Sequence, residues 1–282
     1  MPTTASRWNL PSAIDLVQLD RDHPGFRDPV YRQRRNDIAR AATRHVLGAP
    51  VAEVAYSAEE LGVWSTAMEQ LAPLHELHAC QAYLKASRRL PWTGARIPQL
   101  AEVNRALEPR TGFTLSPVAG LVAPRVFLEH LGQRRFLATQ YMRHHSAPLY
   151  TPEPDVIHEL VGHAAFLSDP EYADLNEQFG SVAKRATEQT AEALIRVYWY
   201  TLEFGAVKEG GAVKAIGAGL LSSFGELGRF AREAELRPLD LNEIAKTPYD
   251  PTNYQKVIFV AESAPQLFGA LRAWLGTLPL RK

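Results

Sequence analysis

Most of the chain carries the hydrophobic periodicity of amphipathic helices. One such pattern covers residues 28–46, and the pair Ser57 and Glu60 predicts a capping box that opens a second helical stretch reaching about residue 85. Pro73 lies inside that stretch and predicts a break there, because proline lacks the amide hydrogen that continues a helix. Pro98 is expected in the first turn of the next helix, which runs to Leu107.

The rest of the chain continues this pattern with few interruptions. Further helices are predicted at 125–131, from Asp155, from Pro170 and across 187–204. Two β-rich segments, 136–142 and 256–260, are too short for more than a small sheet. We therefore predict a mainly α fold, a single compact catalytic domain over residues 1–282 with many helices and a small β element, in which residues 1–18 form a loosely ordered N-terminal segment.

Composition excludes several classes of protein. A chain of 282 residues that is 46% hydrophobic is long enough for one large core. It has 31 basic and 31 acidic side chains, so no net charge attracts it to nucleic acid or to an anionic membrane. No segment has the roughly 18 uninterrupted apolar residues of a membrane span, and the N-terminus does not resemble a signal sequence. With Cys80 as its single cysteine, the chain is expected to be a cytoplasmic protein.

The segment YTPEPDVIHELVGH at 150–163 holds two histidines, His158 and His163, that are five residues apart. The zinc-protease pattern HExxH needs a spacing of four, so this spacing disfavours a zinc protease. On an ideal helix the two side chains would point about 140° apart, so they share a metal only if the helix begins near His158 or contains a π-bulge. The other interpretation is two ordinary polar residues at a helix start.

A carboxylate further along the chain completes a possible metal site. Glu203 lies in the apolar run VYWYTLEFGA, where a buried charge is costly unless it is paired or bound to a cation. Two imidazoles and one carboxylate are typical of a non-haem iron(II) oxygenase. The alternative for Glu203 is a buried salt bridge to Arg143 or Arg196, and Asp155 is expected as a helix N-cap.

Several segments, in a fixed order from about Asp20 to Leu275, resemble the pterin-dependent aromatic amino acid hydroxylases, and especially the single-domain bacterial phenylalanine 4-hydroxylases. They are DRDHPGFRDPVYRQRR at 20–35, IPQLAEV at 97–103, PVAGL at 117–121, TQYMRH at 139–144, YTPEPDVIHELVGH at 150–163, YWYTLEFG at 198–205 and GAGLLSSFGEL at 217–227. Nothing resembles the regulatory domain of the animal enzymes or their tetramerisation tail, so we expect a monomer.

The resemblance implies an iron(II) site with His158, His163 and Glu203 as ligands. It also implies a tetrahydropterin that supplies two electrons, and O2 as the co-substrate that hydroxylates an aromatic ring. Tyr198 matches a family tyrosine close to the iron, and is otherwise a core aromatic residue.

The family pattern also assigns the pterin pocket. It matches Gly120, Val122, Phe127, whose ring would stack on the pterin, and Glu159 as a carboxylate near it. The chain departs from the animal pattern in having Pro124 in place of a serine and Ile195 in place of a small residue.

For the amino acid substrate, Arg143 matches the residue that binds the α-carboxylate, and Asp155 is expected to hold that arginine. The remaining residues that match substrate contacts are Tyr150, Thr151, Pro152, Trp199, Phe204, Gly219 and Ser222. Trp199 disfavours an indole substrate, since tryptophan hydroxylases of the family have a smaller ring there. Phe204 and Gly219 are similar to para-hydroxylating bacterial members.

We therefore expect a phenylalanine 4-monooxygenase of phenylalanine catabolism, linked to pterin-recycling enzymes. Within the same chemistry the alternatives are hydroxylation of tryptophan, of tyrosine, or of phenylalanine at the meta position. From a different class, the alternatives are a zinc hydrolase and a structural metal-binding protein.

Overall fold

Helices make up most of the described chain, as the periodicity predicts. The computed structural model describes residues 17, 19–90 and 94–281, so the expectation of a loosely ordered segment at 1–18 lies, except for Val17, outside the described residues. The longer helices are α1 Pro29–Thr43, α2 Ala58–His78, α4 Leu100–Thr111, α5 Pro124–Leu131, α7 Pro170–Arg185, α8 Glu188–Tyr198 and α13 Ala264–Thr277. The shorter helices are α3 Gln81–Ser87, α6 Ala165–Leu167, α9 Ala218–Ser222, α10 Phe224–Leu227, α11 Phe230–Glu233 and α12 Leu241–Ile244, and the π-helical segments are η1 His158–Ala164 and η2 Trp199–Glu203.

The strands of the described residues form two small sheets. They are β1 Thr114–Pro117, β2 Arg135–Ala138, β3 Ala206–Glu209, β4 Ala212–Ala215, β5 Glu235–Pro238 and β6 Val257–Ala261. Strands β1 and β2 pair in parallel, and the others form a sheet of order β4-β3-β6-β5 in which only the β3–β4 pair is antiparallel. The predicted segments 136–142 and 256–260 contain β2 and β6. The β3–β4 hairpin was not predicted, although the Gly210-Gly211 pair between its strands is a hairpin signal.

The start of α2 is confirmed but its predicted break is wrong. Ser57 accepts a hydrogen bond from the Glu60 amide (3.2 Å) and Glu60 accepts one from the Ser57 amide (2.7 Å). The helix continues through Pro73 because that residue is exposed, so the carbonyl left without a partner can bind water. It ends at His78, after which the Cys80 amide donates to the carbonyl of Ala215 in β4.

The prediction for Pro98 also needs correction. Pro98 precedes α4, whose N-cap is Gln99, and the helix reaches Thr111 instead of ending at Leu107. The Glu102 carboxylate accepts a hydrogen bond from the Gln99 amide at 2.9 Å, so the helix begins where this amide finds a side-chain acceptor.

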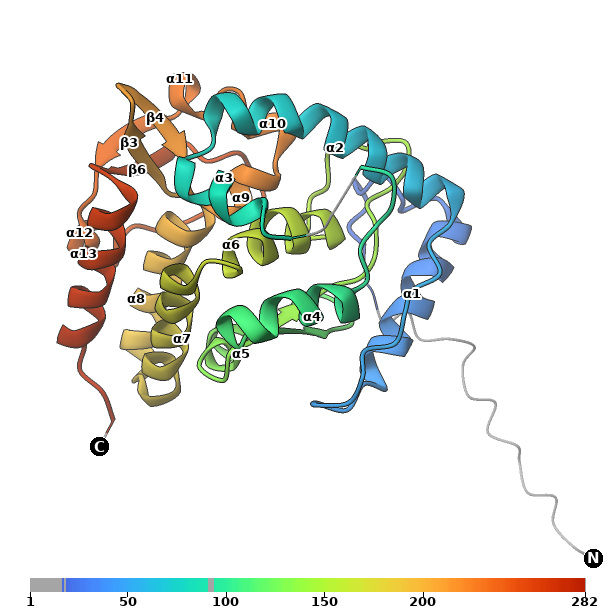
Figure 1. Cartoon of the computed structure of the whole chain (residues 1–282), viewed down its shortest axis with the longest axis horizontal. Helices are drawn as coiled ribbons and strands as arrows, with labels where there is room; N and C mark the ends of the chain where they lie inside the picture. The colour runs from blue at the N-terminus through green and yellow to red at the C-terminus, as the bar shows by residue number, and fades with distance from the viewer. Residues whose placement is uncertain (1–16, 18, 91–93, 282) are drawn as a thin grey trace, which may run out of the picture.

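The long helix α2 crosses one side of the molecule, while α1 and α13 lie at opposite ends (Figure 1). The segment of η1 and α6 lies in the middle, where Ile157, Leu160 and Val161 are buried in the core. Gly162 lets η1 approach α9 closely, because a Cβ at this position would lie 2.8 Å from the Ala218 carbonyl oxygen. The core therefore fixes the two segments that carry His158, His163 and Ser222.

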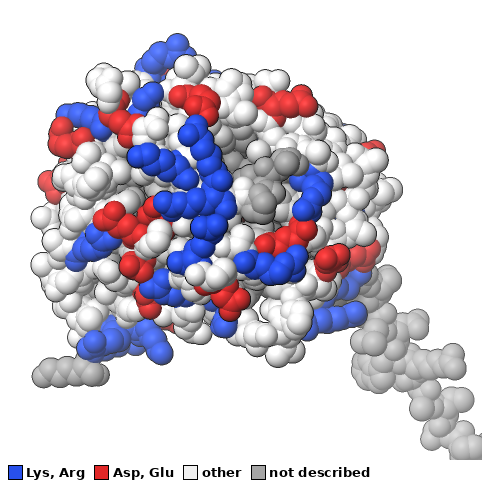
Figure 2. All heavy atoms as spheres, in the orientation of Figure 1, with Lys and Arg blue, Asp and Glu red and all other residues white. Residues whose placement is uncertain are grey.

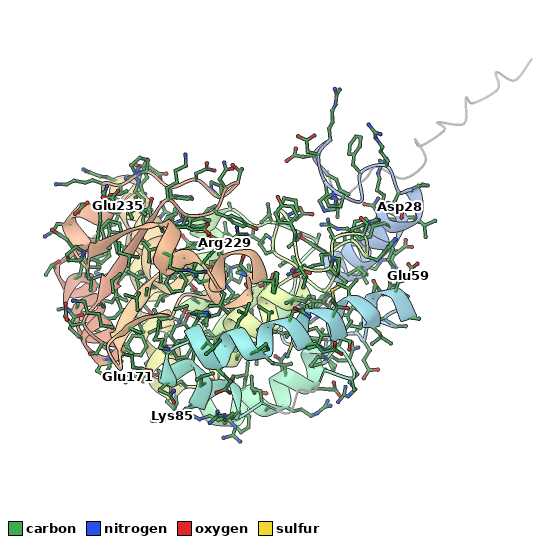
Figure 3. All side chains as sticks on the ribbon, turned by 90° about the horizontal axis from the view of Figure 1, so that it is seen from above. Asp28, Glu59, Lys85, Glu171, Arg229 and Glu235 are labelled. Atoms are coloured by element: carbon green, nitrogen blue, oxygen red, sulfur yellow. The ribbon has the colours of Figure 1, made fainter. Side chains whose placement is uncertain are left out.

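Charged side chains of both signs share the surface, consistent with the zero net charge. On the face seen in Figure 2 a run of Lys and Arg crosses the middle, with Asp and Glu on both sides of it. Many of these groups are paired, as Arg134 is with Asp174 and Glu177, both at 2.6 Å. Figure 3 shows Asp28 and Glu59 at one end of the molecule and Glu235 at the other. Within the described ranges, no helix has the length and hydropathy to cross a membrane.

Candidate active site

Three side chains that could bind one metal ion meet in the centre of the fold. The Nε2 atom of His163 lies 3.0 Å from Nε2 of His158 and 2.9 Å from Oε1 of Glu203. The third edge, from His158 Nε2 to Glu203 Oε2, is 3.8 Å. Two ligand atoms that lie about 2.1 Å from a metal and at a right angle lie about 3.0 Å apart. The three residues therefore fit a metal ion held on one face.

The π-helical segments place these ligands. In η1 the hydrogen bonds run from residue i to i+5, so His158 and His163 return to the same face of the helix. This is the condition that the five-residue spacing requires. In η2 the Phe204 amide donates to the Trp199 carbonyl (2.8 Å), another i to i+5 bond, just where Glu203 enters the site.

Electrostatics prepare the three groups for a cation. Burial, helped by the adjacent His163, lowers the pKa of His158 to about 4, so its imidazole is neutral at pH 7. Burial opposes ionisation of both His163 and Glu203, but their mutual attraction wins, raising the pKa of His163 and lowering that of Glu203. A bound metal ion would replace the proton that this pair shares.

Ser222 orients the first histidine. The His158 Nδ1 atom lies 2.9 Å from the Ser222 hydroxyl, which itself donates to the Ala218 carbonyl at 2.8 Å. The hydroxyl can therefore accept from Nδ1–H, which leaves Nε2 as the free ligand atom. The structure thus places Ser222 against the candidate metal ligand His158 as well as in the cavity wall.

Neither arginine proposed as the alternative partner of Glu203 is paired with it. Arg143 binds Asp155, and Arg196 binds Glu192 at 3.2 Å. The charge of Glu203 is met mainly by His163 at 2.9 Å, with the neutral His158 further away at 3.8 Å. This result favours the metal interpretation over a buried salt bridge.

Asp28, His144 and His145 form a second trio of possible ligands among the described residues. The Ser146 amide donates to Nδ1 of His144 (3.2 Å), so Nε2 of this imidazole carries the proton that it shares with Asp28. That Asp28–His144 contact (3.2 Å) is an ordinary hydrogen bond at the start of α1.

The trio of His158, His163 and Glu203 lines a cavity of about 900 Å³. Every other predicted site residue except Asp155 lines the same cavity, and so do the two departures from the family pattern, Pro124 and Ile195. The predicted residues come together from segments far apart in the chain: Gly120, Val122, Phe127, Arg143, Tyr150, Thr151, Pro152, Glu159, Tyr198, Trp199, Phe204, Gly219 and Ser222.

On the predicted pterin side, Phe127 stands among aromatic rings. Its ring makes edge contacts with Phe136 (5.3 Å between centroids), Tyr198 (5.8 Å) and His163 (6.5 Å). Glu159 accepts hydrogen bonds from the amide and the hydroxyl of Thr139, both at 2.9 Å. Burial raises the pKa of Glu159 to about 7.

Arg143 is fixed by Asp155, as predicted from the sequence. Its Nε and one Nη donate to the two carboxylate oxygens of Asp155 at 2.8 Å, and its backbone amide adds a bond of 2.9 Å. Asp155 also accepts from the amides of Ile157 and His158 (3.2 Å each), so it is the helix cap as well. Asp155 itself is fully buried and acts behind the cavity wall.

Aromatic groups form the opposite wall. The rings of Trp199 and Phe204 lie 4.6 Å apart, and Trp199 also stacks on Tyr249 at 4.6 Å. A Cβ at Gly219 would lie 2.5 Å from the Phe204 ring, so glycine at this position leaves room for that ring. Tyr198 is different, since its hydroxyl donates to Asn176 (3.0 Å) in the core.

Two further parts of the cavity lining were not predicted from the sequence. Glu153 lines the cavity and binds both Arg35 and His23, which ties α1 and the segment before it to the loop at 150–154. The loop at 249–254 also lines the cavity, although no motif marks it. Its sequence, YDPTNY, resembles an ordinary turn.

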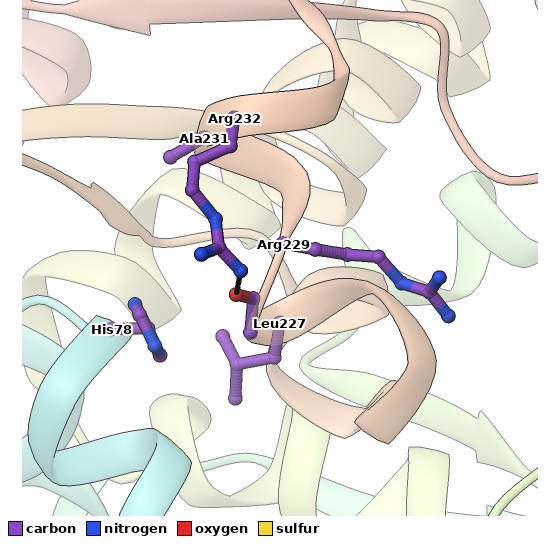
Figure 4. Close-up of a pocket in the computed structure, with 6 residues that line it drawn as sticks. His78, Leu227, Arg229, Ala231 and Arg232 are labelled. Carbon is purple, nitrogen blue, oxygen red and sulfur yellow. Dashed lines mark hydrogen bonds between the residues drawn. The ribbon is translucent and has the colours of Figure 1, made fainter.

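A second, smaller pocket of about 210 Å³ lies between the end of α2 and the α10–α11 segment (Figure 4). Its lining includes His78, Leu227 and Arg232, whose guanidinium donates to the Gly228 carbonyl at 3.1 Å. The predicted site residues all belong to the larger cavity or, for Asp155, to the layer behind it.

Comparison with known proteins places nearly the whole chain in one family. The family model described as biopterin-dependent aromatic amino acid hydroxylase matches residues 14–281. The chloroplastic phenylalanine 4-monooxygenase of Chlamydomonas reinhardtii is 44% identical over 94% of this chain and 73% of its own length. Tyrosine 3-monooxygenase of Homo sapiens is 45% identical over 91% of this chain, which spans 49% of that protein.

A solved structure is similar as well. Phenylalanine hydroxylase of Chromobacterium violaceum, with bound iron(III) and the oxidised cofactor 7,8-dihydrobiopterin, has a TM-score of 0.74 and 32% identity to this chain. The alignment covers 86% of this chain and 94% of that one. These relatives agree on the class of reaction and differ in the aromatic amino acid they act on.

Proposed function

Because the chain belongs to the biopterin-dependent aromatic amino acid hydroxylase family, we propose that it is an iron(II)- and tetrahydropterin-dependent monooxygenase that converts L-phenylalanine to L-tyrosine with O2. The observation that carries the proposal is one cavity of about 900 Å³ that holds both the His158–His163–Glu203 trio and the guanidinium of Arg143. A metal centre and a carboxylate anchor in the same cavity suit an amino acid substrate whose side chain reacts beside the metal.

His158, His163 and Glu203 would hold the iron, and Phe127 and Glu159 would face the pterin. Iron(II) and tetrahydropterin, when bound, supply the electrons and the activation of O2. Ser222 keeps Nε2 of His158 free of its proton, and Thr139 fixes the carboxyl group of Glu159. The aromatic rings of Phe136 and Tyr198 pack against Phe127 and would exclude water from the pterin side of the cavity.

Arg143 would bind the α-carboxylate of the substrate. Asp155 occupies Nε and one Nη proton, which leaves the other Nη protons of the guanidinium for a second carboxylate. Because Asp155 is fully buried, the arginine keeps its position when the substrate is absent.

The aromatic wall favours a phenyl ring as substrate. Trp199, Phe204 and Pro152 offer apolar surface, and burying the hydroxyl of a tyrosine there without a partner costs free energy. Trp199 also takes up space that an indole ring would need. The similarity to bacterial phenylalanine hydroxylases supports the same choice, although tyrosine hydroxylases match the chain at comparable identity.

The test is turnover by the reconstituted protein. Anaerobic apo-protein is loaded with iron(II) and given phenylalanine, a tetrahydropterin and O2, with parallel reactions on tyrosine and tryptophan. We expect para-tyrosine as the main product, with pterin oxidised in equal amount. If the main product is meta-tyrosine, dihydroxyphenylalanine or hydroxytryptophan, the protein is not a phenylalanine 4-hydroxylase. Its activity is then the hydroxylation that yields that product.

Zinc-loaded protein provides the control for the different class of function. Zinc has no accessible redox change, so it should abolish hydroxylation while it occupies the same three ligands. Hydrolysis of ester or peptide substrates by the zinc form, with no hydroxylation by the iron form, would favour a hydrolase. Because each turnover consumes two electrons from the pterin, we also propose that a pterin-reducing enzyme works together with this protein.

A further inference from the structure

One wall of the large cavity is a loop, residues 249–255, that joins α12 to β6. Tyr249, Pro251, Thr252, Asn253 and Tyr254 all line the cavity, and 251–254 are exposed on their outer side. The loop is far in sequence from the other walls. The contacts that hold this loop against the other walls therefore influence the shape of the cavity.

Gln255, the last residue of this loop, makes hydrogen bonds in three directions. Its Oε1 accepts from the indole N–H of Trp199 at 3.0 Å, across 56 residues of chain. Its Nε2 donates to the carbonyls of Asp250 (3.3 Å) and Asn253 (3.1 Å). Its backbone amide donates to Oε1 of Glu226 at 2.8 Å.

The Trp199 ring also packs on two aromatic rings. It stacks on Tyr249 and lies tilted against Phe204, and these apolar contacts do not by themselves fix the direction of the indole N–H. The indole N–H is the only hydrogen-bond donor of this side chain, so the bond to Gln255 determines which edge of the ring points to the loop.

The loop itself rests on α10. A Cβ at Gly225 would overlap the Tyr254 ring, and the guanidinium of Arg229 lies 5.0 Å from the centre of that ring. Figure 4 shows the Arg229 side chain pointing away from His78 and Arg232. With Glu226 holding the Gln255 amide, this side of the loop is anchored to the core.

We propose that Gln255 is a positioning residue that sets the ring specificity of the pocket by fixing Trp199 to the 249–255 loop. The proposal rests on the proposed hydroxylase function. Gln255 does not line the cavity, so it acts through Trp199 and the loop and not by touching the substrate.

The test replaces Gln255 by methionine, which keeps the length of the side chain and removes both hydrogen-bonding groups. The loss of one hydrogen bond to a partly buried donor corresponds to about a tenfold change in an equilibrium constant. We expect Gln255→Met to raise KM for phenylalanine about tenfold and to raise the tryptophan-to-phenylalanine ratio of kcat/KM. Iron content and KM for the pterin should stay unchanged.

Trp199→Phe decides whether the effect passes through the indole. This variant lacks the N–H, so adding Gln255→Met to it should change KM and the substrate ratio less than about twofold further. Gln266 is an exposed glutamine on α13, and Gln266→Met is the matched control. This variant should have the same KM for phenylalanine and the same substrate ratio as the wild type. If Gln255→Met melts too low for kinetics, Gln255→Asn takes its place, because its amide is one methylene too short to reach both partners.

Hydrogen exchange of residues 249–254 gives a readout that does not depend on turnover. We expect Gln255→Met to speed this exchange about tenfold, since the loop loses two hydrogen bonds. Absence of hydroxylation by the wild type would overturn the proposed function, while the exchange result still decides the role of Gln255. Unchanged exchange, an unmoved substrate ratio, or an effect that persists in full beside Trp199→Phe would overturn the inference.

Discussion

At the scale of single residues, the candidate metal site combines two imidazoles with one carboxylate whose charge a cation would balance. His158 is neutral at pH 7 because burial lowers its pKa to about 4, while His163 and Glu203 stabilise each other. Each residue offers one ligand atom to the same point. The loss of any of them leaves two ligands, too few to hold iron tightly.

We predict that His158→Ala, His163→Ala and Glu203→Ala each lose bound iron and lower hydroxylation by roughly 100-fold or more. Metal analysis and turnover of the same preparations provide the measurement. His145→Ala is the control, since that histidine belongs to the second trio, outside the large cavity, and should keep full iron content. A ligand variant with stoichiometric iron and near-normal turnover would remove that residue from the metal site.

The Arg143–Asp155 pair gives a second prediction at this scale. Arg143→Lys keeps the positive charge but cannot bind Asp155 and a substrate carboxylate at once through a planar group. We expect KM for phenylalanine to rise roughly ten- to hundredfold with normal iron content. Arg88→Lys, in an exposed ion pair with Glu76, should change neither. Unchanged phenylalanine affinity in Arg143→Lys would mean that another group binds the carboxylate.

At the scale of elements, the contact between η1 and α9 supports the site. The π-helical turn brings His158 and His163 to one face, and α9 brings Ser222 to His158. The close approach depends on Gly162, since a Cβ there meets the backbone of Ala218 at 2.8 Å.

We predict that Gly162→Ala separates the two elements. Overpacking of this kind costs about 1–3 kcal/mol of stability, and the shift of η1 against α9 should also weaken iron binding. Gly269→Ala in α13 is the matched control, because a Cβ there meets nothing within 4 Å. Gly269→Ala should not change iron binding. It should raise the free energy of unfolding by about 0.5–1 kcal/mol, because alanine has the higher helix propensity. Thermal melting and iron titration of both variants test the prediction, which fails if the two behave alike.

At the scale of the whole molecule, the candidate metal ligands join elements that are distant in the chain. The trio links η1 to η2 across the core, and the cavity walls add loops from 118–123, 149–154 and 249–254. Metal binding to the folded state should therefore stabilise the molecule as a unit.

We predict that iron(II) raises the melting temperature of the apo-protein. When the free iron concentration is about 100 times the Kd, the free energy of unfolding rises by about 2.7 kcal/mol. For a domain of this size, that raises the melting temperature by about 5 °C. The melt is followed under anaerobic conditions with and without iron. His158→Ala should show no such shift, and an equal shift in that variant would place the stabilising iron elsewhere.

Local sequence determined most of the helices and the chemistry of the site residues. The capping box of Ser57 and Glu60, the cap at Asp155 and the family motifs depend on neighbours within a few residues, so the sequence alone predicts them. The types of the three candidate ligands follow from the same local patterns. These parts of the fold were predicted correctly because local hydrogen bonds and periodicity decide them.

Only the tertiary structure decided how those residues meet. The spacing of His158 and His163 allowed a shared metal only in a π-helical or end-of-helix geometry, and packing of η1 on α9 accompanies the first of these. The end of α2 is set by Ala215, whose carbonyl binds the Cys80 amide, and not by Pro73. Gln255 reaches Trp199 across 56 residues. Such contacts depend on which distant surfaces are buried together, and no short segment of the sequence contains that information.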